Sequence, residues 1–221
     1  TNAAPIAEYV MLALLAHAKS WDEIRIDNSE DWRQMRTLRR MEGTTIAVLG
    51  LGAIGSEIVK RALAFDMKVK VLRRSLAPTP PTPDITICTS VNEAVADADY
   101  VVVALAWTRE TEKLIDRSVF LAMKPGVQIV NIARGPIIDH DALAAALDDG
   151  IVGRATLDVT DPEPLPADHP FYSDSRVDVT PHISWSNFEN AERLAIKFLD
   201  NIERYRAGRP IDSLVDPARG Y

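Results

Sequence analysis

Three side chains of the sequence have the chemistry that hydride transfer to a keto acid requires. The guanidinium of Arg134 can bind a carboxylate through two parallel hydrogen bonds and polarise a neighbouring carbonyl group. The imidazole of His182 can donate a proton to an oxygen that develops negative charge. The carboxylate of Glu163 can fix the tautomer of such an imidazole and stabilise its charged form. Each residue alone is as readily structural as functional, so the inference depends on the fold bringing all three together.

A glycine-rich turn earlier in the chain predicts where a dinucleotide would bind. Gly50, Gly52 and Gly55 fill the pattern G-x-G-x-x-G directly after the β-branched and apolar stretch 44–49. The first glycine permits a tight turn, the second lets backbone N–H groups approach a pyrophosphate, and the third lets a helix pack closely on a strand. The start of that helix would present free N–H groups and the positive end of its dipole to the phosphates. Beside such a site, arginine, glutamate and histidine together suit the reduction of a 2-keto acid.

Strands and helices alternate along the chain, which predicts an α/β fold with a doubly wound parallel sheet, the Rossmann dinucleotide-binding fold. Short apolar runs predict strands at 44–49, 68–72, 85–88, 100–105, 127–132, 152–157 and 177–180. Periodic segments predict helices from the glycine turn to residue 65 and at 91–96, 116–123, 139–148 and 186–206. Ligands of such sheets bind outside the carboxyl ends of the strands. Arg134, Glu163 and His182 all follow predicted strands, so we expect them at one edge of the sheet.

The composition of the chain argues against several classes of binding partner. The chain has 221 residues, with 25 basic and 32 acidic side chains and a net charge of −7, which argues against a nucleic-acid-binding surface. Cys88 is the one cysteine, so neither a disulfide framework nor a cysteine metal cluster is expected. No apolar run approaches the roughly 18 residues of a membrane span, and no signal peptide is recognisable. We therefore expect a cytoplasmic protein without a membrane or nucleic-acid partner and without a metal site.

The opening helix and the arm that follows it predict a surface contact. The expected face of the helix repeats at steps of three and four residues, at Ile6, Tyr9, Val10, Ala13, Leu14 and His17. Such a helix requires a surface to pack against. Trp21 and Trp32 lie in the polar, acidic stretch 21–34, which is either a solvated connection or a contact between subunits. The basic run 36–40 is expected to be a solvated face.

Several stretches of the sequence resemble the D-isomer-specific 2-hydroxyacid dehydrogenases, and the resemblance runs over nearly the whole chain. They are 48–55 with the glycines, 104–115 (with Ala106 where the family usually has proline), 130–135 around Arg134, 157–166 around Glu163, and 180–183 around His182. The resemblance implies a homodimeric, NAD(P)-dependent 2-keto acid reductase acting on glyoxylate, hydroxypyruvate or a similar small acid. The alternative is a dimeric regulatory protein of the same fold that senses the dinucleotide without turnover.

The resemblance also implies a role for individual residues. Arg134 is expected to hold the substrate, Glu163 to tune His182, and His182 to donate and accept the proton. Asp158 is expected to contact the nicotinamide end of the cofactor. The full expected cofactor site is Gly50, Gly52, Ala53, Ile54, Gly55, Arg73, Arg74, Ser75, Leu105, Ala106, Thr111, Ile132, Ala133, Arg134, Asp158 and His182.

The residues after the second strand of the predicted sheet bear on the choice of cofactor. An acidic residue about 20 positions beyond the glycines normally binds the ribose 2′-hydroxyl of NAD. Here the strand ends in Arg73, Arg74 and Ser75. Two guanidiniums and a hydroxyl attract the 2′-phosphate of NADP, whereas an acid would repel it. NADP is therefore the expected cofactor, with NAD possible if the arginines are only solvated surface residues.

The resemblance also predicts how the chain is divided. Residues 1–185 are expected to form the dinucleotide-binding domain, including the opening helix and the arm. Residues 186–221 are expected to be a C-terminal helix and tail that return to a substrate domain, whose first part precedes the opening helix in the family. Trp107 and Trp185 lie near the substrate by motif position, although core packing is an equal expectation for Trp185.

Overall fold

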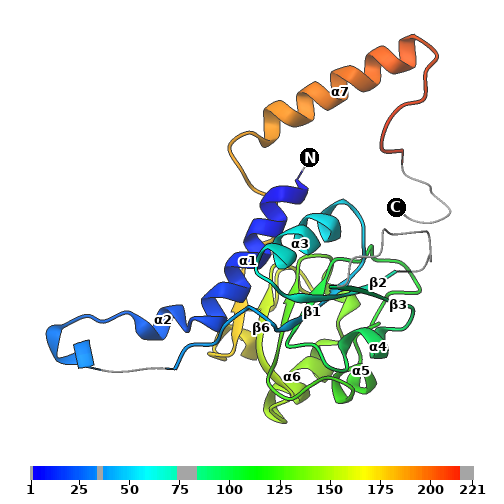
Figure 1. Cartoon of the computed structure of the whole chain (residues 1–221). Helices are drawn as coiled ribbons and strands as arrows, with labels where there is room; N and C mark the ends of the chain where they lie inside the picture. The colour runs from blue at the N-terminus through cyan, green and yellow to red at the C-terminus, as the bar shows by residue number, and fades with distance from the viewer. Residues whose placement is uncertain (1, 34–36, 74–83, 215–221) are drawn as a thin grey trace.

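The computed structural model describes residues 2–33, 37–73 and 84–214. Within them, parallel strands form one sheet in the order β3-β2-β1-β4-β5-β6-β7 (Figure 1). The strands are β1 (Thr45–Leu49), β2 (Lys68–Leu72), β3 (Ile85–Cys88), β4 (Tyr100–Val103), β5 (Val127–Asn131), β6 (Val152–Leu157) and β7 (Val177–Val179). Helices follow β1, β3, β4 and β5 along the chain, so the predicted α/β, doubly wound parallel sheet is confirmed.

The sheet is buried on both faces because its strands alternate between two hydrophobic clusters. Ile46 and Val48 of β1 pack with α1 (Ala3–Ala18) and α3 (Ala53–Ala64). Ala47 and Leu49 point the other way. The opposite cluster includes residues of α4 (Val91–Val95), α5 (Arg117–Leu121) and α6 (His140–Asp148). Helices on both faces account for the nearly continuous apolar runs in the central strands.

Several predicted strands and helices are longer than the observed ones. The strands predicted at 100–105, 127–132 and 177–180 end at residues 103, 131 and 179. Ala104, Leu105 and Ile132, just beyond the ends of β4 and β5, line a cavity described below, so their apolar character reflects a cavity wall as well as a strand. The helix predicted at 186–206 is α7 (Asn190–Arg206), which begins four residues later than predicted. The reason is a turn at Asn187, whose side chain accepts a hydrogen bond from the Glu189 N–H and donates one to the Trp185 carbonyl.

The opening helix packs on the sheet by a face close to the predicted one. Ile6, Val10 and Leu14 are buried as expected. Three further buried side chains that the pattern missed are Ala7, Met11 and Ala18. Tyr9 and Ala13 are partly buried against the same cluster, so the predicted face is confirmed and is wider than the pattern indicated.

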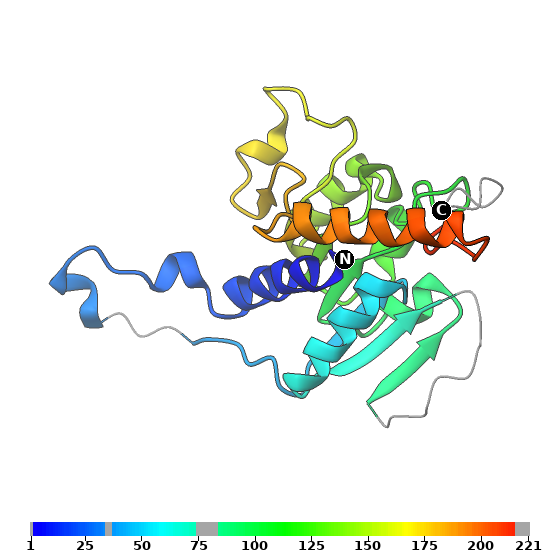
Figure 2. The same cartoon turned by 90° about the horizontal axis from the view of Figure 1, so that it is seen from above.

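Two parts of the chain extend away from the sheet. The arm after α1 contains α2 (Trp21–Ile24) and the 3₁₀ helix η1 (Ser29–Arg33) and projects outward in both views (Figures 1 and 2). The helix α7 stands clear of the sheet in Figure 1, and none of its described side chains is buried. Two other short 3₁₀ helices, η2 (Gly135–Ile137) and η3 (Pro170–Tyr172), lie near the carboxyl edge of the sheet and in the loop before β7.

The first residue of α6 gives a prediction about stability and pH. Both ring nitrogens of His140 are buried without a hydrogen-bond partner, and the ring packs edge-on against Phe171 with centroids 5.6 Å apart. Burial lowers the pKa of His140, outweighing the opposing fields of Asp161, Asp139 and Asp141. The unfolded chain therefore binds the proton more readily, and stability is lost as the pH falls below about 6.5.

We expect His140→Leu to flatten this pH dependence. The free energy of urea unfolding should fall less steeply between pH 7.5 and 5.5 in the variant, by up to about 1.4 kcal/mol per pH unit. His17, whose pKa burial also lowers, is present in both proteins and cancels in the comparison. Parallel curves for the two proteins would contradict the assignment to His140.

Candidate active site

The glycine turn between β1 and α3 has the shape that a pyrophosphate requires. Gly50 has a φ of 109°, in the left-handed region that favours glycine. A Cβ on Gly55 would lie 2.0 Å from the Gly50 carbonyl oxygen, so only glycine lets α3 pack this closely. A Cβ on Gly52 would meet nothing within 4 Å, which leaves open space beside the N-terminus of α3, where Ala53 is the first residue. The turn therefore fits a bound phosphate group.

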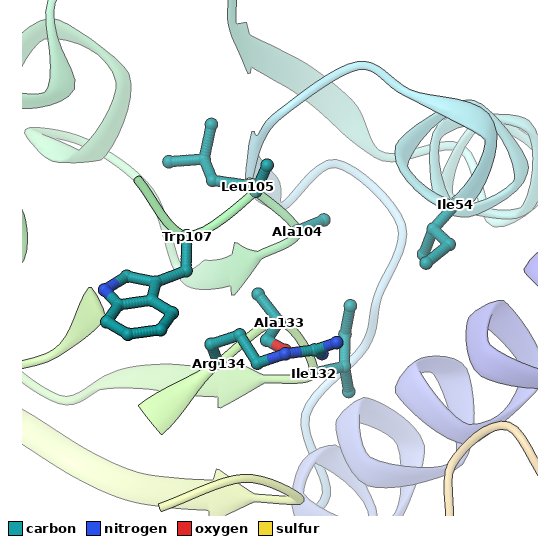
Figure 3. Close-up of a pocket in the computed structure, with 8 residues that line it drawn as sticks. Ile54, Ala104, Leu105, Trp107, Ile132, Ala133 and Arg134 are labelled. Atoms are coloured by element: carbon teal, nitrogen blue, oxygen red, sulfur yellow. The ribbon is translucent and has the colours of Figure 1, made fainter. Parts of the chain in front are cut away.

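A cavity of about 370 Å³ adjoins this turn (Figure 3). Its walls are Ile54 at the start of α3, the segment 104–107 after β4, and the segment 132–134 after β5. In Figure 3 the side chains of Leu105, Trp107 and Arg134 lie around the same space as Ile54. Strand order reverses between β1 and β4, and this is the point at which parallel sheets bind ligands. The structure thus brings the predicted residues Ile54, Leu105, Ala106, Ile132, Ala133 and Arg134 into one cavity.

A second cavity, of about 200 Å³, extends the site toward β2. Its lining includes Leu105, Arg73 at the end of β2, and Thr111. Because Leu105 also lines the first cavity, the two form neighbouring parts of an elongated cleft, as a dinucleotide requires. The hydroxyl of Thr111 donates to the Ala106 carbonyl at 2.8 Å, so this side chain shapes the loop after β4. Arg74 and Ser75 lie outside the described residues.

The two candidate acid–base residues, Glu163 and His182, lie in the loops after β6 and β7. His182 Nδ1 is 2.6 Å from Glu163 Oε1, and the two side chains are about two-fifths exposed. The contact fixes the orientation of the imidazole ring and leaves Nε2 to face a substrate. A further cavity, of about 410 Å³, is lined by both residues and by the buried Asp158. Sequence reasoning paired Glu163 with His182, and the geometry has them in contact.

The third candidate, Arg134, follows β5, the neighbour of β6 in the sheet. Its Nη1 donates to the Ala133 carbonyl at 2.6 Å, and among the described residues no carboxylate forms an ion pair with it. The next residue, Gly135, lies so close to the loop of Glu163 that a Cβ would be 2.0 Å from the Thr160 carbonyl. The Arg134 and Glu163 loops therefore pack directly together at the carboxyl edge.

Asp158 is buried and hydrogen-bonded to the loop that carries His182. The residue is only 1% exposed. Its Oδ1 accepts from the Thr180 hydroxyl at 2.7 Å and the Ile183 N–H at 2.8 Å, and its Oδ2 accepts from the Ser184 N–H at 3.0 Å. These contacts tie the carboxylate to the loop that carries His182, whereas its expected contact with the nicotinamide stays a prediction. Sequence reasoning missed Thr180 as a member of the site, although it directly precedes Pro181 and His182.

The two tryptophans near the site differ in what they contact. Trp107 is half exposed and lines the first cavity. Trp185 is 43% exposed, so the expectation of core packing was wrong. Its indole N–H donates to the His182 carbonyl at 2.8 Å, which makes it a second support of the histidine loop.

Comparison with known proteins identifies the family. Residues 9–184 match the D-isomer specific 2-hydroxyacid dehydrogenase family, in its NAD binding domain. This chain belongs to the D-isomer-specific 2-hydroxyacid dehydrogenase family. Its members named among the relatives are oxidoreductases, so the expected enzyme class and a nicotinamide dinucleotide as cofactor are confirmed at the level of the family.

The relatives differ in how much of this chain, and of their own length, the similarity covers. A chloroplastic D-3-phosphoglycerate dehydrogenase 3 of Arabidopsis thaliana is 38% identical over 72% of this chain and 27% of its own length. Glyoxylate/hydroxypyruvate reductase B of Yersinia pestis is 32% identical over 94% of this chain and 62% of its own length. A solved D-isomer specific 2-hydroxyacid dehydrogenase of Xanthobacter autotrophicus, in complex with NADPH and MES, is 29% identical with a TM-score of 0.87, covering 100% of this chain and 90% of that one. The chain thus spans less than two thirds of both curated relatives.

The part of the chain that the structure describes lacks two further features. No helix there is long and apolar enough to cross a membrane. No group of three or more histidine, cysteine, aspartate or glutamate side chains there could hold a metal ion.

The two glycines of the turn give a matched prediction. Gly55→Ala should lower the free energy of unfolding by about 1–3 kcal/mol, because its Cβ would collide with the Gly50 carbonyl. Gly52→Ala should change stability by less than about 1 kcal/mol, because its Cβ enters open space, yet it should weaken dinucleotide binding. Urea denaturation and fluorescence titration with NADPH measure the two effects. Equal loss of stability in both variants would show that the described geometry of the turn is wrong.

Proposed function

We propose that the protein carrying this chain is a 2-keto acid reductase that transfers a hydride between NADP(H) and a small 2-keto or D-2-hydroxy acid. The observation that carries the proposal is the 2.6 Å contact between His182 Nδ1 and Glu163 Oε1, at the same sheet edge as Arg134. A regulatory protein that only senses the dinucleotide would use the same cleft. It would have no use for this pair, so the pair favours an enzyme.

The three side chains divide the work of the proposed reaction. When bound in the cleft, the nicotinamide supplies the hydride for the ketone carbon. Arg134 binds the substrate carboxylate in two-pronged geometry, and its charge polarises the adjacent carbonyl. His182 donates a proton from Nε2 to the ketone oxygen, while Glu163 holds Nδ1 and supports the charged ring. In the reverse direction, the neutral ring accepts the proton of the hydroxyl group.

Arg73 supports NADP as the preferred cofactor. It lies at the end of β2, lines the second cavity and stands where NAD-binding folds carry an acidic residue. A guanidinium can donate charge-assisted hydrogen bonds to a 2′-phosphate. The Xanthobacter relative in complex with NADPH is consistent with this preference.

The size of the first cavity and the name of one relative favour a small 2-keto acid as the substrate. The first cavity holds about 370 Å³ between Ile54, Trp107 and Arg134, which suits a small acid beside a nicotinamide ring. The name of the Yersinia relative points to glyoxylate or hydroxypyruvate as candidates. Residues 186–221 would return to a substrate domain, which would complete this pocket.

The single, buried Cys88 suits a reducing, cytoplasmic setting.

We expect Arg73→Ala to weaken NADPH binding by about tenfold or more, because it removes a charge-assisted hydrogen bond to the 2′-phosphate. NADH has no such phosphate, so its affinity should hardly change and serves as the internal control. Titration of the protein with each cofactor measures the effect. An equal loss for the two cofactors would rule out a specific role for Arg73.

His182→Ala should lower kcat by roughly 10²–10⁴-fold, the usual span for a lost general acid. NADPH affinity should be nearly unchanged. Arg134→Ala should instead raise KM for the keto acid, because it removes the anchor of the substrate carboxylate. Steady-state oxidation of NADPH with a panel of keto acids separates the two patterns. Normal turnover in His182→Ala would refute the proposed mechanism.

The arm after α1 is the proposed contact of a homodimer. The segment 21–33 projects from the sheet (Figure 2). On it, Trp32 is 79% exposed and Trp21 is also exposed. Exposed aromatic side chains of this kind mark interaction sites. Light scattering should find a dimer at micromolar concentration, and Trp21→Ser with Trp32→Ser should shift it toward monomer. Leu121→Ser, an exposed apolar change on α5, is the control; a monomeric unmodified protein would contradict the proposal.

A further inference from the structure

Tyr9 of α1 is linked by hydrogen bonds to the loop that carries His182, although the two are far apart in the sequence. Its hydroxyl lies 2.6 Å from Thr180 Oγ1, and the Thr180 hydroxyl donates to Asp158 Oδ1 at 2.7 Å. A hydroxyl has a single proton, and that of Thr180 is committed to the carboxylate. Tyr9 must therefore be the donor in its contact with Thr180. The chain of bonds has one direction, from Tyr9 through Thr180 to Asp158.

The loop at the end of this chain has a backbone conformation that is uncommon for residues other than glycine. His182 has a φ of 51°, in the left-handed region. Such a backbone persists in a residue other than glycine only when its surroundings over-determine it. Here the His182 N–H donates to the Asp158 carbonyl, and the next two N–H groups, of Ile183 and Ser184, donate to the Asp158 carboxylate. Asp158 is thus the clamp that keeps the ring of His182 against Glu163.

We propose that Tyr9 is a positioning residue for the acid–base pair, acting through Thr180 and Asp158. The inference rests on the proposed function, because positioning matters only if His182 transfers a proton. Tyr9 touches neither His182 nor Glu163, and by sequence periodicity it is only one position on the packed face of a helix.

Two features of the surroundings make Tyr9 a dependable donor. The helix α1 lies beside the sheet (Figure 1). Its buried side chains Ile6, Val10 and Leu14 pack it there, so the Tyr9 hydroxyl approaches Thr180 from a fixed helix. Burial raises the pKa of Tyr9 to about 12, which keeps the hydroxyl protonated over the working range of pH. The side chain therefore donates, without titrating, to a network that ends on a carboxylate.

The test compares Tyr9→Phe with Tyr100→Phe. Tyr100 is a buried tyrosine in the same hydrophobic cluster, but it lies at the start of β4, the opposite edge of the sheet from the site. We expect Tyr9→Phe to speed hydrogen exchange at the Ile183 and Ser184 N–H groups by about two- to tenfold, the effect of one net hydrogen bond. It should lower kcat by a similar factor and leave NADPH affinity unchanged. Tyr100→Phe should alter neither quantity.

A second set of variants tests whether Tyr9 and Thr180 act through the same chain of hydrogen bonds. Thr180→Val removes the hydroxyl that links Tyr9 to Asp158 and should reproduce the effects of Tyr9→Phe. Thr180→Ser keeps a hydroxyl at this position, so its exchange rates and kcat should be close to those of the unmodified protein. The double variant with Tyr9→Phe and Thr180→Val should lose less than the sum of the single losses, because both interrupt one chain. Additive losses would overturn the proposal.

The outcomes separate this proposal from the proposed function. Unchanged exchange at Ile183 and Ser184 in Tyr9→Phe overturns the positioning role, whatever the activity. Faster exchange with an unchanged kcat also overturns it, because the clamp would then not serve the chemistry. If the unmodified protein fails to reduce any keto acid, the proposed function fails by itself. The exchange rates together with the ¹⁵N shift of the His182 ring then decide the positioning role, and an unaltered shift in Tyr9→Phe overturns it.

Discussion

The buried carboxylate of Asp158 is the group on which the geometry of the site depends. A carboxylate that is 1% exposed loses its hydration, and this loss must be offset by hydrogen bonds. The described donors to its oxygens are the Thr180 hydroxyl and the N–H groups of Ile183 and Ser184, all from the segment after β7. Satisfying one buried charge therefore fixes the path of that segment. The position of His182 therefore depends on the hydrogen bonds that the buried carboxylate of Asp158 requires.

The order of the strands explains why the site has two halves that meet at Arg134. The segments after β1, β4 and β5 line the proposed dinucleotide cleft, and the segments after β6 and β7 carry the candidate acid–base residues. Strand β5 lies between β4 and β6 in the sheet, so its end is next to both halves. Arg134 follows β5, lines the cleft, and is followed by Gly135, which packs against the Glu163 loop. In the proposed reaction a substrate held by Arg134 would thus lie between the nicotinamide and the imidazole.

The sequence predicted the elements and the pairing of Glu163 with His182, but not the hydrogen bonds that support this pair, for a physical reason. The strands 68–72, 85–88 and 152–157 were predicted with the observed limits, because runs of apolar and β-branched residues are local signals. Residues 104, 105 and 132 were assigned to strands, since a cavity wall is as apolar as a buried strand. The pairing of Tyr9 with Thr180 joins residues 171 positions apart, and no local pattern encodes such a contact.

The three chemical groups are held with different rigidity, and the difference matches the work proposed for each. His182 is fixed through its backbone by Asp158 and through its ring by Glu163. Arg134 has a long side chain whose hydrogen bond is to the carbonyl of its own neighbour, Ala133. Proton transfer tolerates little displacement of the donor, so a rigid imidazole suits it. A guanidinium can bind a carboxylate from several directions by small rotations of its stem, so looser support is sufficient there.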